Sequence, residues 1–270
     1  MDQPNGVTAM LSLSKGRYGA RLAATPQDLH AAQALRWRSF IGQRQGATAT
    51  GPADPASASD AALDADDFDA ICRHILVEEL ATGRLVCCFR MLPLKDGSEI
   101  GRSYAAQYYE LSALRAFQGR MVEMGRFCID PDCRDPDILR VAWAAMTRFV
   151  DDEGVEMLFG CSSFMGTDWE GYADAFAVLA ERHLAPKRWL PRVKAPQVVR
   201  YARALIGRKG DPKRAMLHMP PLLRTYLLMG GWVSDHAVID RELNTLHVFT
   251  GLEIRAIPPA RARALRLVAG

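Results

Sequence analysis

The sequence predicts an α/β fold, with a mixed central sheet flanked by helices in a single domain. Two features of the 270-residue chain carry this prediction. Residues 120–161 follow a strand, helix, strand pattern, which is typical of two parallel neighbours joined by a crossover helix. Residues 71–92 hold two apolar runs separated by a glycine-bearing turn, which is typical of an antiparallel hairpin. No repeat or Gly-Ser linker divides the chain.

Composition limits the class of protein. Apolar residues make up 49% of the chain, enough for a sizeable core. The net charge of +3 is far below what a surface devoted to nucleic acid needs, so we expect no nucleic-acid partner. Residues 1–10 lack the pattern of a signal peptide, and no run approaches the ~20 apolar residues that span a bilayer. We expect a cytoplasmic protein.

The six cysteines are scattered and contain no Cys-x-x-Cys pair, so we expect reduced, mostly buried thiols. They are Cys72, Cys87, Cys88, Cys128, Cys133 and Cys161. A metal site built from Cys128, Cys133 and a distant histidine has poor spacing, and we expect no metal. A catalytic cysteine is a further alternative that the spacing does not favour.

The first elements are well marked. Residues 1–15 are expected to be flexible, and residues 16–24 to form a strand. Thr25, Pro26 and Asp28 then supply an N-cap, a first-turn proline and an acidic capping partner, which predicts a helix. The apolar positions of this helix keep helical spacing, namely Leu29, Ala32, Leu35 and Phe40.

Residues 42–65 form a polar stretch rich in Gly, Ala, Thr, Ser, Pro and Asp, with almost nothing to bury. We expect a mobile loop. A loop of this length in a compact domain suggests a lid or a segment ordered by substrate. A dispensable insertion is an equally open interpretation.

The remaining elements follow from the same signals of period, cap and turn. We expect strands at 71–78 and 84–92 around Gly83, a helix at 104–116, a strand at 120–129, a helix capped by Asp135 and ended by Gly154, a strand at 155–161, helices at 172–184 and 222–229, and strands at 237–239 and 246–254. The domain is expected to cover residues 16–257, followed by a tail at 258–270.

Glu123 and Arg126 are two charges in an otherwise apolar strand. On a regular strand, residues three apart face opposite sides, so a shared site requires a bulge, which Gly125 would tolerate. The alternative is a purely structural pair or a strand edge. Other charges in the first half of the chain favour a functional site over a structural pair, because a single cleft could gather them. They are Arg36, Asp66, Asp69 and Arg90.

The order Arg36-x-x-x-Phe40, Asp66-x-x-Asp69, Arg90 and Glu123-x-x-Arg126 resembles that of the acyl-homoserine lactone synthases, which implies a GNAT-like fold. A closer resemblance is to the ornithine N-acyltransferases. It extends from about Tyr18 to Ile254 and is carried by residues 66–74, 123–126, 159–168 and 220–226.

The closer resemblance implies an activity. The chain is expected to transfer a long-chain, 3-hydroxylated fatty acyl group from acyl carrier protein to the α-amine of L-ornithine, the first step of ornithine-lipid synthesis. It also implies roles for residues of the matching segments: Glu123 and Arg126 in catalysis, and Arg36, Phe40, Asp66, Asp69, Arg90, Ser162 and Ser163 in substrate binding.

Two departures from these families matter. The lactone synthases have a tryptophan soon after the position of Phe40, and residues 41–49 contain none, so signal synthesis is the weaker alternative. An acidic residue is expected where His247 stands. Glycine, lysine and glutamine therefore stay open as acceptors beside ornithine.

The turn before the crossover helix bears on the acyl donor. In acetyl-CoA enzymes of this fold the turn is glycine-rich and its N–H groups bind pyrophosphate. Here residues 133–137 read Cys-Arg-Asp-Pro-Asp, so a donor N–H is missing and two carboxylates repel phosphate. We expect no bound cofactor and a donor carried on the phosphopantetheine of acyl carrier protein.

The segment 187–214 is rich in lysine and arginine and contains few acidic residues, so it carries a strong positive charge. It is expected either to steer the acidic carrier protein or to contact anionic lipid at the inner face of a membrane. Both interpretations are open.

We expect direct attack of the α-amine on the thioester, with Glu123 as the base. Arg126 and Arg90 would bind the acceptor carboxylate or orient Glu123. Asp66 and Asp69 would bind the acceptor's side-chain ammonium or order the loop. Backbone N–H groups near Phe127 and Cys161 would hold the thioester oxygen. The alternatives are a CoA-dependent acetyltransferase and a non-enzymatic module that binds lipid or carrier protein.

Overall fold

The computed structural model describes residues 11–42 and 63–269. Residues 1–10 and 43–62, which hold most of the predicted flexible N-terminus and mobile loop, lie outside it. The chain forms two compact units. Unit 1 comprises residues 1–90, 126–153 and 264–270, and unit 2 comprises residues 91–125 and 154–263.

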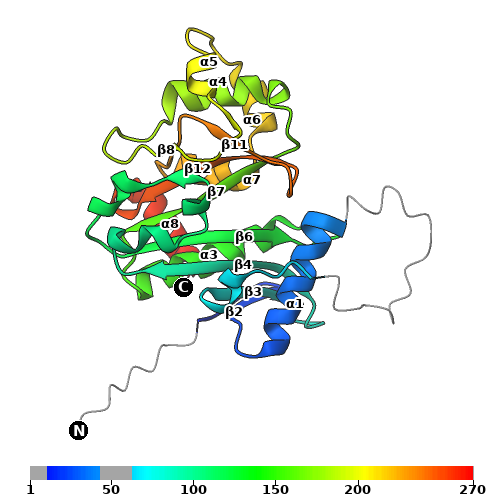
Figure 1. The fold of residues 1–270 in the computed structure, drawn as a ribbon. Helices are drawn as coiled ribbons and strands as arrows, with labels where there is room; N and C mark the ends of the chain where they lie inside the picture. The colour runs from blue at the N-terminus through cyan, green and yellow to red at the C-terminus, as the bar shows by residue number, and fades with distance from the viewer. Residues whose placement is uncertain (1–10, 43–62, 270) are drawn as a thin grey trace, which may run out of the picture. The chain divides into compact units, whose positions relative to one another are not determined.

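Unit 1 is a sheet with a helix on each face (Figure 1). Its strand order is β1-β2-β3-β4-β6, and β4 and β6 each continue into unit 2. The elements are β1 (Ser12–Lys15), β2 (Tyr18–Leu22), α1 (Pro26–Trp37), the π-helix η1 (Arg38–Gly42), the 3-10 turn η3 (Asp67–Ala70), β3 (Arg73–Glu79), β4 (Leu85–Leu94), β6 (Met121–Ile129), α3 (Pro136–Asp152) and the end of α8 (Pro259–Ala269).

Helix α1 begins as the sequence predicts. The Thr25 hydroxyl accepts the Asp28 N–H at 3.1 Å, and the Asp28 carboxylate accepts the Thr25 N–H at 3.1 Å. This reciprocal capping box satisfies two N–H groups that the first turn leaves without helical partners. Its inner side contributes Ala32 and Leu35 to a core that also contains Leu76.

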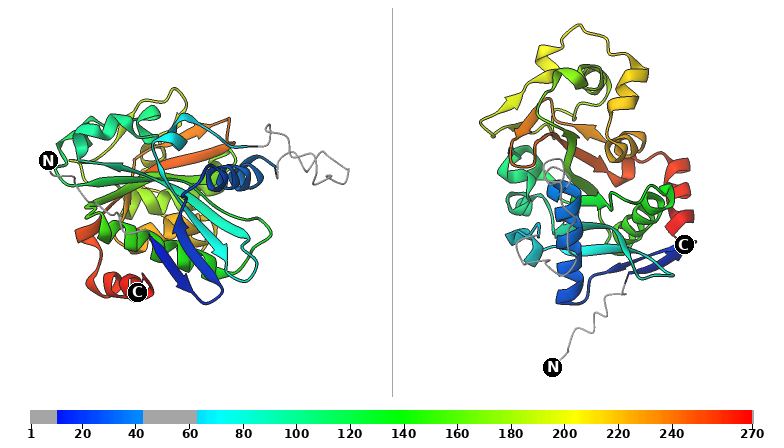
Figure 2. Two further views of the ribbon diagram at one scale, coloured as in Figure 1. Left: turned by 90° about the horizontal axis from the view of Figure 1, so that it is seen from below. Right: turned by 90° about the vertical axis from the view of Figure 1, so that its right-hand side faces the viewer.

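Helix α3 is capped by Asp135, whose side chain accepts the Asp137 N–H, and Pro136 opens it. Figure 2 shows α1 and α3 on opposite faces of the unit 1 sheet. The centre of β3 is buried at successive residues because both faces are covered. The predicted hairpin is confirmed, with Gly83 at φ 70° in its turn.

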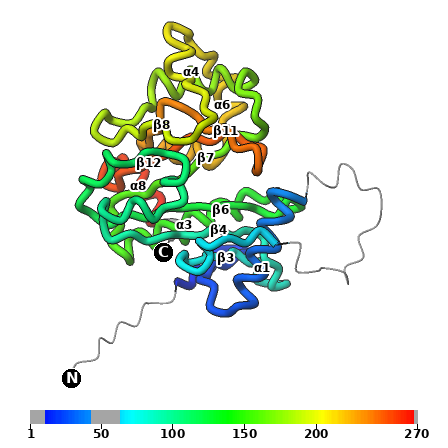
Figure 3. Tube along the Cα trace, viewed as in Figure 1, coloured from blue at the N-terminus to red at the C-terminus, as the bar shows by residue number. Residues whose placement is uncertain are grey.

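Unit 2 has the strand order β6-β7-β12-β11-β9, with β10 also paired to β12 (Figure 3). Strands β6 and β7 are parallel, as predicted, and the other pairs of this sheet are antiparallel. The elements are η4 (Gly97–Arg102), η5 (Ala105–Gln107), β5 (Tyr109–Glu110), η6 (Ser112–Ala116), β7 (Met157–Met165), η7 (Glu170–Tyr172), α4 (Ala173–Arg182), β8 (Arg192–Val193), β9 (Val198–Val199), α5 (Tyr201–Ala204), α6 (Pro212–His218), α7 (Pro221–Leu228), β10 (Trp232–Val233), β11 (Ala237–Asp240), β12 (Thr245–Glu253) and η8 (Ile254–Ala256).

The strand register gives the unit 2 sheet two distinct faces. Side chains of directly opposed residues share a face, and neighbours along a strand alternate. Phe164 and Val248 lie on the face that packs against Phe176 of α4 in the main core of the unit. Residues of the opposite face are joined by the pairs Glu123 with Phe159, Cys161 with Phe249 and Ser163 with His247.

Two predicted elements differ in the structure. Residues 12–15, placed in the flexible N-terminus, form β1 beside β2. The helix predicted at 104–116 is wrong, since that segment forms η5, β5 and η6. Tyr109 is buried, pairs with Val193 of β8 and hydrogen-bonds to His247, so tertiary contacts outweigh the helical propensity of the segment.

In the described part of the chain, no helix is long and apolar enough to cross a bilayer. The longest described helix, α3, carries charged residues along its solvent side.

The pairing of strands β6 and β7 ends at Met124 and Gly160. A Cβ atom on Gly160 would lie 2.3 Å from the Met124 carbonyl oxygen. We predict that Gly160→Ala lowers the free energy of unfolding by roughly 1–3 kcal/mol, the usual cost of overpacking. Urea denaturation measures this value.

The matched control for this prediction is Gly171→Ala, because a Cβ atom there meets nothing within 4 Å. It should change stability by less than about 1 kcal/mol. Equal stability of the two variants would contradict the close approach.

Candidate active site

Unit 1 contains a buried network of three arginines and three aspartates from four separate segments. The arginines come from α1, β4 and β6, and the aspartates from the turn that precedes β3. The members are Arg36, Asp64, Asp66, Asp69, Arg90 and Arg126. The structure thus brings together the predicted set Arg36, Asp66, Asp69, Arg90 and Arg126, and adds Asp64.

Arg36 is the most deeply buried member, with 1% of its surface exposed. Its Nη1 and Nη2 donate to the two carboxylate oxygens of Asp69 at 2.8 and 2.7 Å, a bidentate pair. Its Nε lies 3.1 Å from an Asp64 carboxylate oxygen, and it also donates to the Asp64 carbonyl oxygen. Gln33 Nε2 donates to Asp69 at 2.9 Å, so the carboxylate of Asp69 is fully engaged.

Arg90 connects Asp66 to Asp69. Its Nη1 donates to Asp66 at 2.5 Å and to Asp69 at 2.8 Å, and its Nη2 donates to Asp66 at 2.9 Å. Its guanidinium lies over the Phe68 ring. Arg126 lies at the more open side, with its Nε 3.0 Å from Asp64 and its Nη2 3.3 Å from Asp66.

The arginines hold the carboxylates of Asp69 and Asp66 ionised. Burial raises the pKa of the Asp69 carboxyl, but the hydrogen bonds from Arg36, Gln33 and Arg90 outweigh it and place that pKa well below its usual range. Burial also raises the pKa of the Asp66 carboxyl, but the hydrogen bonds and charge of Arg90 outweigh it and lower that pKa. Such a network is costly to break, because removal of one member leaves a buried charge without a partner.

Arg126 has a left-handed backbone, with φ at 51°. This conformation is unfavourable for a residue that carries a Cβ atom. The strand irregularity that the sequence requires is therefore present, but it lies on Arg126 and not on Gly125. It interrupts the alternation of side chains along β6 and accompanies the contact of the guanidinium with Asp64 and Asp66.

Phe40 follows α1 in the π-helix η1 and is half-buried. It packs against the core cluster that contains Leu35 and Cys128. Its role in substrate binding stays a prediction.

Glu123 lies in unit 2, on the sheet face that it shares with Cys161 and Ser163. It is 4% exposed. Its two carboxylate oxygens accept the backbone N–H groups of Tyr104 and Ala105, each at 2.7 Å. Two N–H donors fix the orientation of the carboxylate. A shared role of Glu123 and Arg126 stays a prediction.

Ser162 and Ser163 point to opposite faces of β7. The buried Ser162 hydroxyl accepts a hydrogen bond from the Thr250 hydroxyl at 2.9 Å, on the face that packs on α4. Ser163 is exposed and lies opposite His247 in the register. Of the two, Ser163 lies on the face of Glu123 and Cys161.

A pair that the sequence did not single out as a site covers this face, namely Tyr109 and His247. The Tyr109 hydroxyl donates to the His247 carbonyl oxygen at 2.7 Å, so His247 Nδ1, 3.1 Å away, is the donor to the hydroxyl oxygen. Burial lowers the pKa of His247 to about 4 and keeps the ring neutral. Sequence alone showed only an unexpected histidine.

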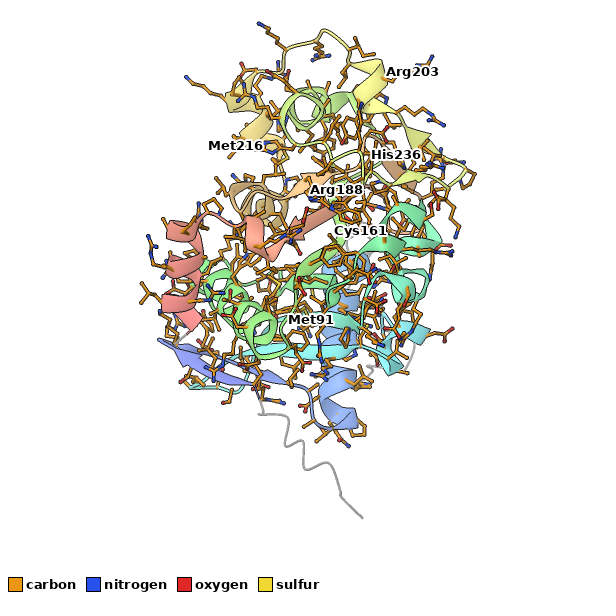
Figure 4. All side chains as sticks on the ribbon, turned by 90° about the vertical axis from the view of Figure 1, so that its left-hand side faces the viewer. Met91, Cys161, Arg188, Arg203, Met216 and His236 are labelled. Carbon is orange, nitrogen blue, oxygen red and sulfur yellow. The ribbon has the colours of Figure 1, made fainter. Side chains whose placement is uncertain are left out.

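The six cysteines are free thiols, of which Cys87, Cys88 and Cys128 are buried and the other three half-buried. Figure 4 labels Cys161 on β7. Among the described residues, no three histidine, cysteine or acidic side chains are grouped to hold a metal ion.

Comparisons with known proteins bear on the fold and on the family. Residues 35–144 match the family described as the acetyltransferase (GNAT) domain, which confirms the expected fold. The chain is 33% identical over 246 residues to the L-ornithine N(alpha)-acyltransferase of Rhodobacter capsulatus, covering 89% of this chain and 91% of the relative. It is 29% identical over 244 residues to the protein of the same name from Rhizobium meliloti, covering 88% and 80%.

One solved structure that the chain matches is that of FeeM, an N-acyl amino acid synthase from uncultured soil microbes. It is 12% identical, with a TM-score of 0.49, and the match covers 94% of this chain and 98% of that protein.

The buried network gives a stability prediction. Arg36→Leu leaves Asp69 and Asp64 without their central partner, and should lower the free energy of unfolding by about 3–5 kcal/mol. Arg38→Leu is the matched control, because the Arg38 side chain is 53% exposed and its partner Asp130 keeps a second cation, Arg84. It should cost about 0–1 kcal/mol in the same urea titration. Equal costs would contradict the structural weight of the network.

The buried His247 gives a pH prediction. Its folded pKa of about 4 lies below the ordinary value of 6.5, so the unfolded chain binds the proton first. Its contribution to stability is complete above pH 6.5 and is lost as pH falls toward 4, by about 3 kcal/mol in total. His247→Gln should flatten this part of the stability curve measured by urea denaturation. Identical pH slopes for the variant and the wild type would refute the assignment.

Proposed function

The chain belongs to the L-ornithine N(alpha)-acyltransferase family, and from this premise we propose that it acylates the α-amine of L-ornithine. The observation that carries the proposal is the match to relatives of that name along nearly their whole length. The acyl group is a long-chain, 3-hydroxylated fatty acid, and the product is the lyso lipid that opens ornithine-lipid synthesis. The reaction takes place in the cytoplasm.

The acyl donor in this proposal is a thioester on acyl carrier protein. The start of α3 supports an acyl donor that brings no pyrophosphate to this turn. The Asp135 side chain already accepts an N–H group there, and Pro136 has no N–H to offer. Asp137 forms an ion pair with Arg140 at 2.6 Å. A pyrophosphate would have to displace one carboxylate and lie beside another. The single phosphate of phosphopantetheine does not require this site.

Glu123 is the proposed base. The α-ammonium of the acceptor transfers a proton to its carboxylate, directly or through one water molecule, and the free amine attacks the thioester carbonyl carbon. An N–C bond forms, the C–S bond breaks, and the thiol of the carrier leaves with a proton. The fixed N–H bonds from Tyr104 and Ala105 support this role, because they hold the base in one orientation.

The sequence predicted five members of the buried network. Of these five, Arg126 and Asp66 have the most exposed side chains, at 14% and 25%. We assign the acceptor carboxylate to Arg126 and the side-chain ammonium to Asp66. Arg36, Asp69 and Arg90 are more deeply buried and hold these two in place. Backbone N–H groups near Cys161, where the pairing of β6 with β7 has ended, hold the thioester oxygen.

The test is a mass-spectrometric assay. The protein is incubated with 3-hydroxyacyl carrier protein and a panel of ornithine, lysine, glutamine and glycine, and parallel reactions contain the matching acyl-CoA. We expect N-acyl ornithine from the carrier protein. If another amino acid is acylated instead, the assignment of ornithine as the acceptor is wrong. Turnover that prefers acyl-CoA overturns the assignment of acyl carrier protein as the donor. If no product forms at all, the alternative that remains is a non-enzymatic binding module.

In the same assay we predict that Glu123→Gln loses two or more orders of magnitude, roughly what a positioned base contributes. Gln keeps one carbonyl acceptor for the Tyr104 or Ala105 N–H, so a thermal melt separates misfolding from lost chemistry. Glu110→Gln is a control at an exposed carboxylate of the same unit that accepts the Ser112 N–H. Near-normal turnover of Glu123→Gln would remove this residue from the base role.

A further inference from the structure

Residues 206–217, at the end of α5 and along α6, combine exposed apolar side chains with positive charge. We call them the α6 segment. The Ile206 side chain is 80% exposed, that of Leu217 is 77% exposed, and that of Met216 is 48% exposed. Figure 4 labels Met216 on α6. Large apolar side chains at this exposure on one short segment are typical of a surface that meets a partner.

Positive charges surround these apolar side chains. The α6 segment contains four cations and one carboxylate, namely Arg208, Lys209, Lys213 and Arg214 with Asp211. Within the part of the chain that the structure describes, neither Lys209 nor Lys213 forms an ion pair. On α6, Lys213, Met216 and Leu217 are three and four residues apart, so they share one exposed face.

The α6 segment is held in shape by Asp174 of α4. The Asp174 carboxylate lies 3.5 Å from Arg208 and 3.3 Å from Arg214, and it accepts the Asp211 N–H at 3.3 Å. Asp211 in turn caps α6 by accepting the N–H groups of Lys213 and Arg214. Met216 and Leu217 are therefore presented by the capped helix α6, and Ile206 lies in the turn between α5 and α6.

We propose that the α6 segment docks the protein on an anionic lipid surface. Ile206, Met216 and Leu217 enter the boundary between headgroups and acyl chains, while Lys209 and Lys213 remain at the level of the phosphates. A face that combines apolar and cationic side chains matches the two layers of an anionic membrane surface, the acyl chains and the phosphates. The inference uses only this surface, so it stands apart from the proposed acyl transfer.

The test is co-sedimentation of the full chain, without substrates, with vesicles of phosphatidylcholine alone or mixed with phosphatidylglycerol. We expect tighter binding to the anionic vesicles and weakening by high salt. Ile206→Ser with Leu217→Ser should weaken the binding by about tenfold or more. Lys209→Glu with Lys213→Glu should weaken it by about tenfold or more.

The matched control is Leu80→Ser with Lys15→Glu, an exposed apolar residue and an exposed cation of unit 1. It should leave vesicle binding unchanged, and far-ultraviolet circular dichroism checks that all variants fold. Equal binding to both vesicle types overturns the proposal. So does anionic binding that survives the Ile206 and Leu217 changes.

A third measurement separates the lipid from an acidic protein partner. Acyl transfer from soluble carrier protein, measured without vesicles, should be unaffected by either pair of changes in the α6 segment. If vesicle binding survives and this turnover falls, the segment docks the carrier protein and the lipid proposal is wrong. An inactive wild type with intact vesicle binding would remove the acyl-transfer proposal alone.

Discussion

The bidentate contact between Arg36 and Asp69 is the interaction on which unit 1 depends. It joins α1 to the turn before β3, and Asp69 passes the connection on to Arg90 of β4. Neither residue has an alternative partner in water, because both are buried. Charges in such a place are stable only together, so the loss of one member destabilises the others. The more open members, Asp66 and Arg126, owe their fixed positions to this buried half.

Much of the fold follows from local signals in the sequence. The Thr25 and Asp28 capping box, the Asp135 cap and the Gly83 turn are contacts between close neighbours in the chain, and each is where the sequence predicts it. The segment 104–116 is different. Its helical pattern competes with a distant partner strand, with the Tyr109 contact to β12 and with the Glu123 carboxylate that takes two of its N–H groups. No local signal reports such partners.

The candidate site divides in the same way. The spacing of charges in the sequence predicted that Arg36, Asp66, Asp69 and Arg90 gather, and they do. Their hierarchy of burial is a property of packing and is not visible in spacing. Asp64 was missed because a single aspartate after a polar stretch carries no pattern. The backbone of Arg126 was also beyond reach, since sequence points to glycine as the residue for a left-handed φ.

The Tyr109 and His247 pair restricts which residues can replace one another. The phenol has a single proton, and the His247 carbonyl oxygen accepts it, so the phenolic oxygen is left to accept the His247 ring N–H. A carboxylate at 247 has no hydrogen to offer and would compete with its own backbone for that one proton. An acid in place of His247 therefore also changes the hydrogen bonds of Tyr109, so the two positions are coupled in this structure.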